Sequence, residues 1–103
     1  MKTWYLVIND GCVVAKSDDK AVAEQYADEM NDTGAEESAD EYGYESGSPE
    51  SYYQNGYDGG FHEVERVKVP RGADENMEID AGSYSFTVED INSAPEIDEQ
   101  YFW

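Results

Sequence analysis

The sequence predicts a small α+β domain, in which one small antiparallel sheet carries one main helix. Three observations lead to this prediction. Residues 3–8 and 83–88 have the residue types and alternation of strands, residues 18–33 repeat apolar side chains at helical spacing, and Asp10-Gly11 reads as a hairpin turn. The length of 103 residues is that of a single domain, which we place at 1–103.

An N-terminal ββα unit is expected first, with strands at 3–8 and 12–16. The segment TWYLVI is rich in the aromatic and β-branched residues that strands prefer. Five of the six positions are apolar, the exception being Thr3. Both faces of this strand should therefore be covered, and the strand should be central. Asp10-Gly11 suits a tight turn, because both turn positions require a positive φ.

The main helix is expected at about residues 18–33. Ser17 or Asp18 can cap its first free N–H groups. One face carries apolar residues at i, i+4 and i+8, namely Val22, Tyr26 and Met30. Gly34 is the expected end, because glycine readily takes the left-handed conformation that stops a helix.

Two further strands are expected at 61–69 and 83–88. The hydrophobic phase changes inside the first of them, which predicts a bulge near Glu65-Arg66. The segment TVED at 87–90 fits a capping box that starts a short helix through Ala94. We expect the terminal Tyr101-Phe102-Trp103 to dock on the domain, on a partner or in a dimer.

Residues 34–60 are expected to form a long acidic loop or a partly disordered insert. This segment has six glycines, four serines and seven carboxylates, and it lacks Val, Ile, Leu, Met and Phe. Only SPESYYQ, at 48–54, suggests a single helical turn. The five tyrosines of the segment are interface anchors, low-complexity filler, or residues that fold back on the sheet.

Charge is the most unusual property, with 25 Asp and Glu against 6 Lys and Arg, a net of -19. Across a compact domain roughly 33 Å wide, this is about one charge per 1.7 Å, the axial charge density of duplex DNA. The acidic residues concentrate at 34–60 and 72–103, which contain no Lys or Arg. We therefore expect a surface for a basic partner, formed by Glu36, Glu37, Asp40, Glu41, Tyr42, Tyr44, Glu45, Glu50, Tyr52, Tyr53, Tyr57, Asp58, Asp74, Glu75, Glu78 and Asp80.

Catalytic, metal and cofactor sites are not expected. Cys12 and His62 are the only cysteine and histidine, and we expect them to be a buried strand residue and an exposed strand residue rather than a catalytic pair. The frame that best resembles a calcium loop, 29–40, lacks the required ligands at three positions. Direct nucleic-acid binding requires clustered Lys and Arg and is excluded by the sign of the charge.

A small, strongly acidic chain with segregated carboxylates resembles the DNA-mimic inhibitors of bacteriophages, which include anti-restriction and anti-CRISPR proteins. The resemblance is one of size and charge. It implies a non-catalytic inhibitor that occupies the basic DNA-binding channel of a defence nuclease or CRISPR surveillance complex. The alternatives are a salt-adapted soluble domain and an acidic adaptor for another basic protein.

A reducing cytoplasm is the expected compartment, which for a phage protein is that of the host cell. The single cysteine allows no internal disulfide. We find no signal peptide and no apolar run of membrane-spanning length, and so expect no association with a membrane.

Overall fold

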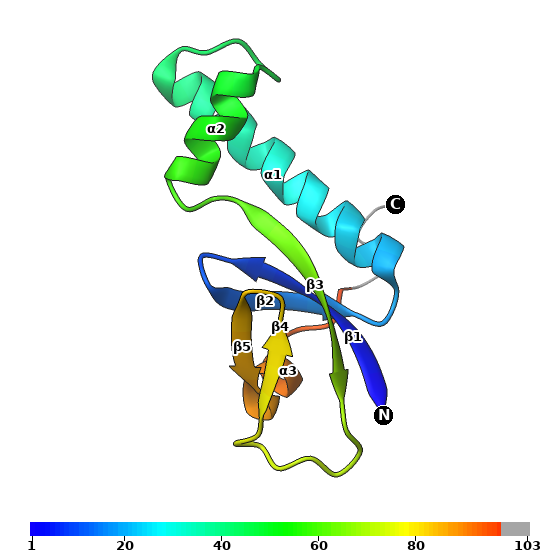
Figure 1. Ribbon diagram of the computed structural model, residues 1–103. Coiled ribbons are helices and arrows are strands. Elements are labelled where there is room, and N and C mark those ends of the chain that lie inside the picture. The colour runs from blue at the N-terminus through cyan, green and yellow to red at the C-terminus, as the bar shows by residue number, and fades with distance from the viewer. Residues whose placement is uncertain (98–103) are drawn as a thin grey trace.

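The computed structural model describes residues 1–97, and its elements, in chain order, are β1 (Lys2–Asn9), β2 (Cys12–Ser17), α1 (Lys20–Tyr42), α2 (Pro49–Tyr57), β3 (His62–Val69), β4 (Glu78–Ala81), β5 (Tyr84–Thr87) and α3 (Val88–Ser93) (Figure 1). The predicted α+β class and its N-terminal ββα unit are confirmed. The C-terminal Tyr101-Phe102-Trp103, for which docking was expected, lies outside the described residues. In the described part, no helix has the length and apolarity that crossing a membrane requires.

The central sheet has the antiparallel order β2-β1-β3, so β1 is the middle strand, as its two apolar faces predict. Asp10 and Gly11 join β1 to β2 with φ angles of 51° and 77°, which confirms the predicted turn. Because β1 is hydrogen-bonded on both edges, its side chains can be buried only by layers above and below the sheet.

Those layers differ on the two faces of the sheet. Leu6 and Ile8 pack with residues of β4, β5 and α3 in one hydrophobic cluster. Val7 packs on the other face with Ala23 and Ala27 of α1. Figure 1 shows this arrangement, with α1 on one side of the central sheet and the β4–β5 hairpin on the other. Two separate clusters therefore hold one sheet between a helix and a hairpin.

The bulge predicted in the third strand is wrong. β3 pairs with β1 without interruption from Lys2↔Val69 to Asn9↔His62, and the irregularity lies instead in the β1–β2 pairing, between Val7 and Ile8. The hydrophobic phase of β3 changes because both of its faces are covered. Val67 and Val69 face the hairpin side, while Val64 packs in the cluster under α1.

A second, two-stranded sheet was not expected. β4 pairs with β5 from Glu78↔Thr87 to Ala81↔Tyr84. The sequence did not predict β4, because this strand has only four residues and two of them are acidic. The predicted capping box is confirmed. Thr87 accepts a hydrogen bond from the Asp90 N–H, and the Asp90 carboxylate accepts one from the Thr87 N–H, which starts α3.

The predicted end of the main helix at Gly34 is wrong, and so is the long loop at 34–60. α1 continues to Tyr42 and ends at Gly43, whose φ is 76°. After a short connection, the Ser48 side chain caps α2, and Pro49 lies in the first turn of this helix. α2 has nine residues, whereas the sequence suggested only a single helical turn. The segment is thus a helical hairpin, and in Figure 1 it extends beyond the edge of the sheet.

Candidate protein-interaction surface

The exposed side of α1 carries carboxylates at strict four-residue intervals. We call these five residues the acidic row: Glu24, Asp28, Asp32, Glu36 and Asp40. Residues four apart are neighbours on a helix surface, so the row is a ridge of negative charge that turns around α1 by about 40° per step. All five are exposed, and only Glu24 has an ion pair in the described structure, with Lys20 at 3.8 Å.

Glu29, Glu37 and Glu41 add a second line beside the acidic row, and all three are exposed. Residues 24 to 41 span about 26 Å of helix at a rise of 1.5 Å per residue. Eight carboxylates over this length give about one charge per 3.6 Å, against 3.4 Å per phosphate along one strand of DNA. The helix therefore matches the linear charge density of a single strand.

The tyrosines of the α1–α2 helical hairpin do not fold back into the core. Tyr53 and Tyr57 are 76% and 79% exposed, and Tyr42, Tyr44 and Tyr52 are each more than one third exposed. The rings of Tyr42 and Tyr44 stack with their centroids 6.1 Å apart. Large amphipathic rings that remain accessible beside charged groups are typical of protein interfaces.

Hydrogen bonds from two of these tyrosines cross between the helical segments. The Tyr52 hydroxyl donates to Asp32 Oδ1 at 2.6 Å, and the Tyr42 hydroxyl donates to Asp58 Oδ2 at 3.4 Å. The bond to Asp32 raises the pKa of Tyr52, and the negative charges of Asp58 and Glu41 raise the pKa of Tyr42. Both shifts favour the protonated hydroxyl, which is the form that donates in these bonds.

A pocket of about 540 Å³ opens between α1, α2 and the start of β3. Asp28 and Asp32 contribute its carboxylates, and Tyr52, Tyr53 and Phe61 contribute aromatic walls. Phe61 is 55% exposed although it is fully apolar. Carboxylates next to aromatic faces form an environment that suits the guanidinium of an arginine, which can pair with the acids and stack on the rings.

The structure separates the predicted site residues into two groups. Those at 36–58 belong to the helical hairpin, with Glu45 in the connection and Glu50 in the first turn of α2. Asp74, Glu75, Glu78 and Asp80 are also exposed, but they belong to β4 and the segment before it, on the opposite face of the central sheet. The two acidic regions therefore do not form one continuous surface.

Sequence analysis missed Glu24, Asp28, Glu29 and Asp32 as members of the surface. They belong to the helix that was expected to end at Gly34, so they were not joined to Glu36 and Asp40. The available signal was the unbroken four-residue spacing from 24 to 40, which runs across Gly34. Phe61 was also missed, because it was assigned to a strand.

Cys12 is exposed, contrary to the buried position that we expected. It lies opposite Asn9 in the β1–β2 pairing, and His62 lies opposite the same Asn9 in the β1–β3 pairing. Two strand spacings, about 10 Å, therefore separate the Cα atoms of Cys12 and His62. The His62 ring instead lies against the Gly60 carbonyl oxygen, with Nδ1 at 2.9 Å.

Over residues 1–97, no three His, Cys, Asp or Glu side chains converge in the way that a metal site requires. The frame that resembles a calcium loop, 29–40, is helical throughout and belongs to α1. Its carboxylates consequently point outward along the helix instead of enclosing a cation.

No protein-family model, no curated protein and no solved structure matches this chain.

Proposed function

We propose that the protein is a non-catalytic inhibitor that acts as a DNA mimic. Its α1–α2 hairpin would occupy the basic DNA-binding channel of a defence nuclease or CRISPR surveillance complex. The observation that carries the proposal is the acidic row, which repeats negative charge along about 24 Å of helix at one charge per turn. Together with Glu29, Glu37 and Glu41, the row has the charge density of one DNA strand.

Recognition follows from the chemistry of the two surfaces. A channel that binds DNA presents Lys and Arg at positions set by the phosphates, and carboxylates can accept the same paired hydrogen bonds from arginine. The exposed tyrosines add apolar contact area, and the pocket beside Asp28 and Asp32 can receive one arginine side chain. The carboxylates would steer the encounter, and the tyrosines would slow dissociation.

The folded state of the hairpin favours a mimic over an adaptor that folds on binding. α1 is anchored on the sheet through Ala23 and Ala27, and α2 is anchored on α1 through the Tyr52–Asp32 bond. The charges are therefore held in place before the partner arrives, which reduces the entropic cost of association.

The proposal is tested with two variants of equal charge change. One replaces Glu36, Glu37, Asp40 and Glu41 by Gln, Gln, Asn and Gln. The matched control replaces Asp74, Glu75, Glu78 and Asp80 by Asn, Gln, Gln and Asn. Protein immobilised at low salt is exposed to a bacterial lysate, and bound proteins are eluted with duplex DNA and identified.

We expect the wild type and the control to retain a DNA-binding protein that duplex DNA releases, and the hairpin variant to lose it at least tenfold. Binding should also weaken steeply between 50 and 200 mM salt, on the order of tenfold or more, as charge contacts are screened. Equal losses in both variants would show that only net charge matters. Retention of a basic protein that DNA does not release would support the adaptor alternative.

A further inference from the structure

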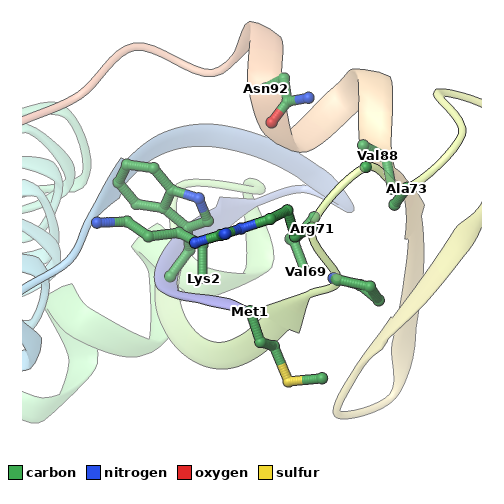
Figure 2. Close-up of a pocket in the computed structure, with 10 residues that line it drawn as sticks. Met1, Lys2, Val69, Arg71, Ala73, Val88 and Asn92 are labelled. Atoms are coloured by element: carbon green, nitrogen blue, oxygen red, sulfur yellow. The ribbon is translucent and has the colours of Figure 1, made fainter.

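A second pocket, of about 510 Å³, lies at the end of the sheet where β1 begins and β3 ends. It is formed by the start of β1, the end of β3 with the turn that follows, and one side of α3 (Figure 2). In Figure 1 this end of the molecule lies away from α2, and the longest dimension of the molecule is 50 Å.

The charge of this pocket is opposite to that of the protein. Its walls contain Lys2 and Arg71 and no carboxylate, in a chain where 25 of 103 residues are acidic. Three other pockets of the described structure each include at least one Asp or Glu. Of these four pockets, this one alone has cationic side chains and no carboxylate in its walls.

Arg71 is held in position by its backbone. The Ala73 N–H donates to the Pro70 carbonyl oxygen at 3.2 Å, and Gly72 has a φ of 71°, so residues 70–73 form a tight turn with Arg71 at its corner. Within residues 1–97, the Arg71 guanidinium has no ion pair, although the chain has an excess of carboxylates. Figure 2 shows its side chain extending toward Lys2 across the pocket.

Lys2 and Trp4 complete the polar and aromatic side of the pocket. The Lys2 ammonium lies 4.7 Å from the centre of the Trp4 ring and 3.3 Å from Asp18 Oδ2, so its stem crosses the ring. Val69 and Val88 are buried residues whose side chains supply apolar wall. Two cations thus lie beside an aromatic ring and two branched aliphatic side chains.

We infer that this pocket binds a small organic anion. A carboxylate or phosphate group would lie against Arg71 and Lys2, because a guanidinium offers paired donors to either group. The apolar body of the ligand would lie against Val69 and Val88, next to Trp4, as most small-molecule sites combine apolar walls with a few placed charges. The Trp4 ring itself already has the Lys2 and Lys16 ammonium groups 4.7 and 4.6 Å from its centre. The acidic hairpin does not prevent binding, since charges separated by much more than the Debye length of about 8 Å are screened at physiological salt.

Trp4 provides the readout. In a Trp103→Phe background, Trp4 is the only tryptophan, and its fluorescence is titrated at 0.15 M salt with benzoate, phenyl phosphate or neutral benzyl alcohol. We expect saturable binding of benzoate or phenyl phosphate and at least tenfold weaker binding of benzyl alcohol. The tighter of the two anions identifies the headgroup.

Arg71→Gln should weaken anion binding at least tenfold. Arg66→Gln is the matched control, because Arg66 is an exposed arginine of β3 that does not line the pocket. The inference is overturned if neither anion saturates, if benzyl alcohol binds as tightly, or if both arginine variants lose the same affinity. None of these outcomes depends on the partner of the hairpin, so the two proposals fail separately.

Discussion

The side chain of Asn55 in α2 lies against the backbone of Gly34 in the middle of α1, and a Cβ atom at Gly34 would overlap the Asn55 amide. Asn55 is buried and donates a hydrogen bond to the Gly60 carbonyl oxygen at 3.2 Å. The two helices can approach at this point only because one of them has no side chain there. Gly34 is therefore a packing residue of the hairpin.

Gly34→Ala should destabilise the protein by about 1–3 kcal/mol, because the new methyl group displaces a buried, hydrogen-bonded amide. Gly56→Ala is the control, since Gly56 also lies inside a helix and its nearest neighbour would be Phe61 Cβ at 4.0 Å. That control should gain about 0.5–1 kcal/mol from helix propensity. Urea denaturation gives both values, and a stabilising effect of Gly34→Ala would contradict the packing described here.

The acidic row should make the free protein less stable than its neutralised variant. Asp28→Asn with Glu36→Gln removes all four repulsive pairs in the row and spares Asp32, which binds Tyr52. At roughly 0.2–0.5 kcal/mol per pair, the expected gain is about 1–2 kcal/mol at low salt. Urea denaturation should show this gain at 10 mM salt and little of it near 1 M, where screening removes the repulsion.

The control for the row is Glu75→Gln with Glu78→Gln, which changes the charge equally on the other face of the sheet. It should gain clearly less than the row variant at 10 mM salt. If both variants gain the same stability, the repulsion comes from net charge rather than from the spacing along α1.

The Tyr52–Asp32 bond should have a definite pH dependence. The pKa of Tyr52 is raised above its usual 10.0 by this bond, so folding favours the protonated hydroxyl. The stability that the bond contributes is present below pH 10 and is lost as the pH rises through the higher folded pKa. The difference in unfolding free energy between wild type and Tyr52→Phe should be constant from pH 7 to about 9.5 and shrink above it.

Absorbance of the phenolate measures the titration itself. Subtracting the alkaline titration of Tyr52→Phe from that of the wild type isolates Tyr52, whose midpoint should lie above 10.0. Asp32→Ala should lower this midpoint, and an unchanged midpoint would show that Asp32 is not its cause.

Lys16 should be the most important basic residue for stability. Its buried ammonium donates to the Ile91 and Asn92 carbonyl oxygens at 2.9 and 3.1 Å, at the end of α3. Burial lowers the pKa of Lys16, and the charge of Glu96 opposes this shift. Lys16→Met should cost about 1–3 kcal/mol, because it leaves two carbonyls without their donor. Exposed Lys20→Met should change stability by less than about 0.5 kcal/mol.

Local patterns were sufficient to predict the first two strands, their turn and the start of α3. The predicted cap of the main helix, Ser17 or Asp18, was wrong, because Asp19 caps α1. The apolar faces of β1, the Asp10-Gly11 turn and the capping box at Thr87 are each decided by a few adjacent residues, and the structure confirms all three. The larger errors lie where a distant segment decides. β3 changes its hydrophobic phase because separate layers cover its two faces, so the change was misread as a bulge.

The candidate surface divides in the same way. Its chemistry, a tyrosine-rich segment with seven carboxylates and no Lys or Arg, can be read from the sequence, because charge and composition do not depend on folding. Its geometry cannot be read there. Glycine, serine and tyrosine predict a loop by local propensity. Residues 34–60 are mostly helical because α1 and α2 pack on each other, with Asn55 against Gly34 and with Ala35 and Ser51 buried.

The sequence by itself determined the net charge of -19, its segregation and the ββα start, since these depend on composition and neighbouring residues. Only the tertiary structure decided that α1 continues past Gly34 and so joins five carboxylates in one row, that a second acidic group lies across the sheet, and that Lys2 and Arg71 meet in one pocket. The physical reason is that packing between segments far apart in the chain, such as Gly34 with Asn55, outweighs their local conformational preferences.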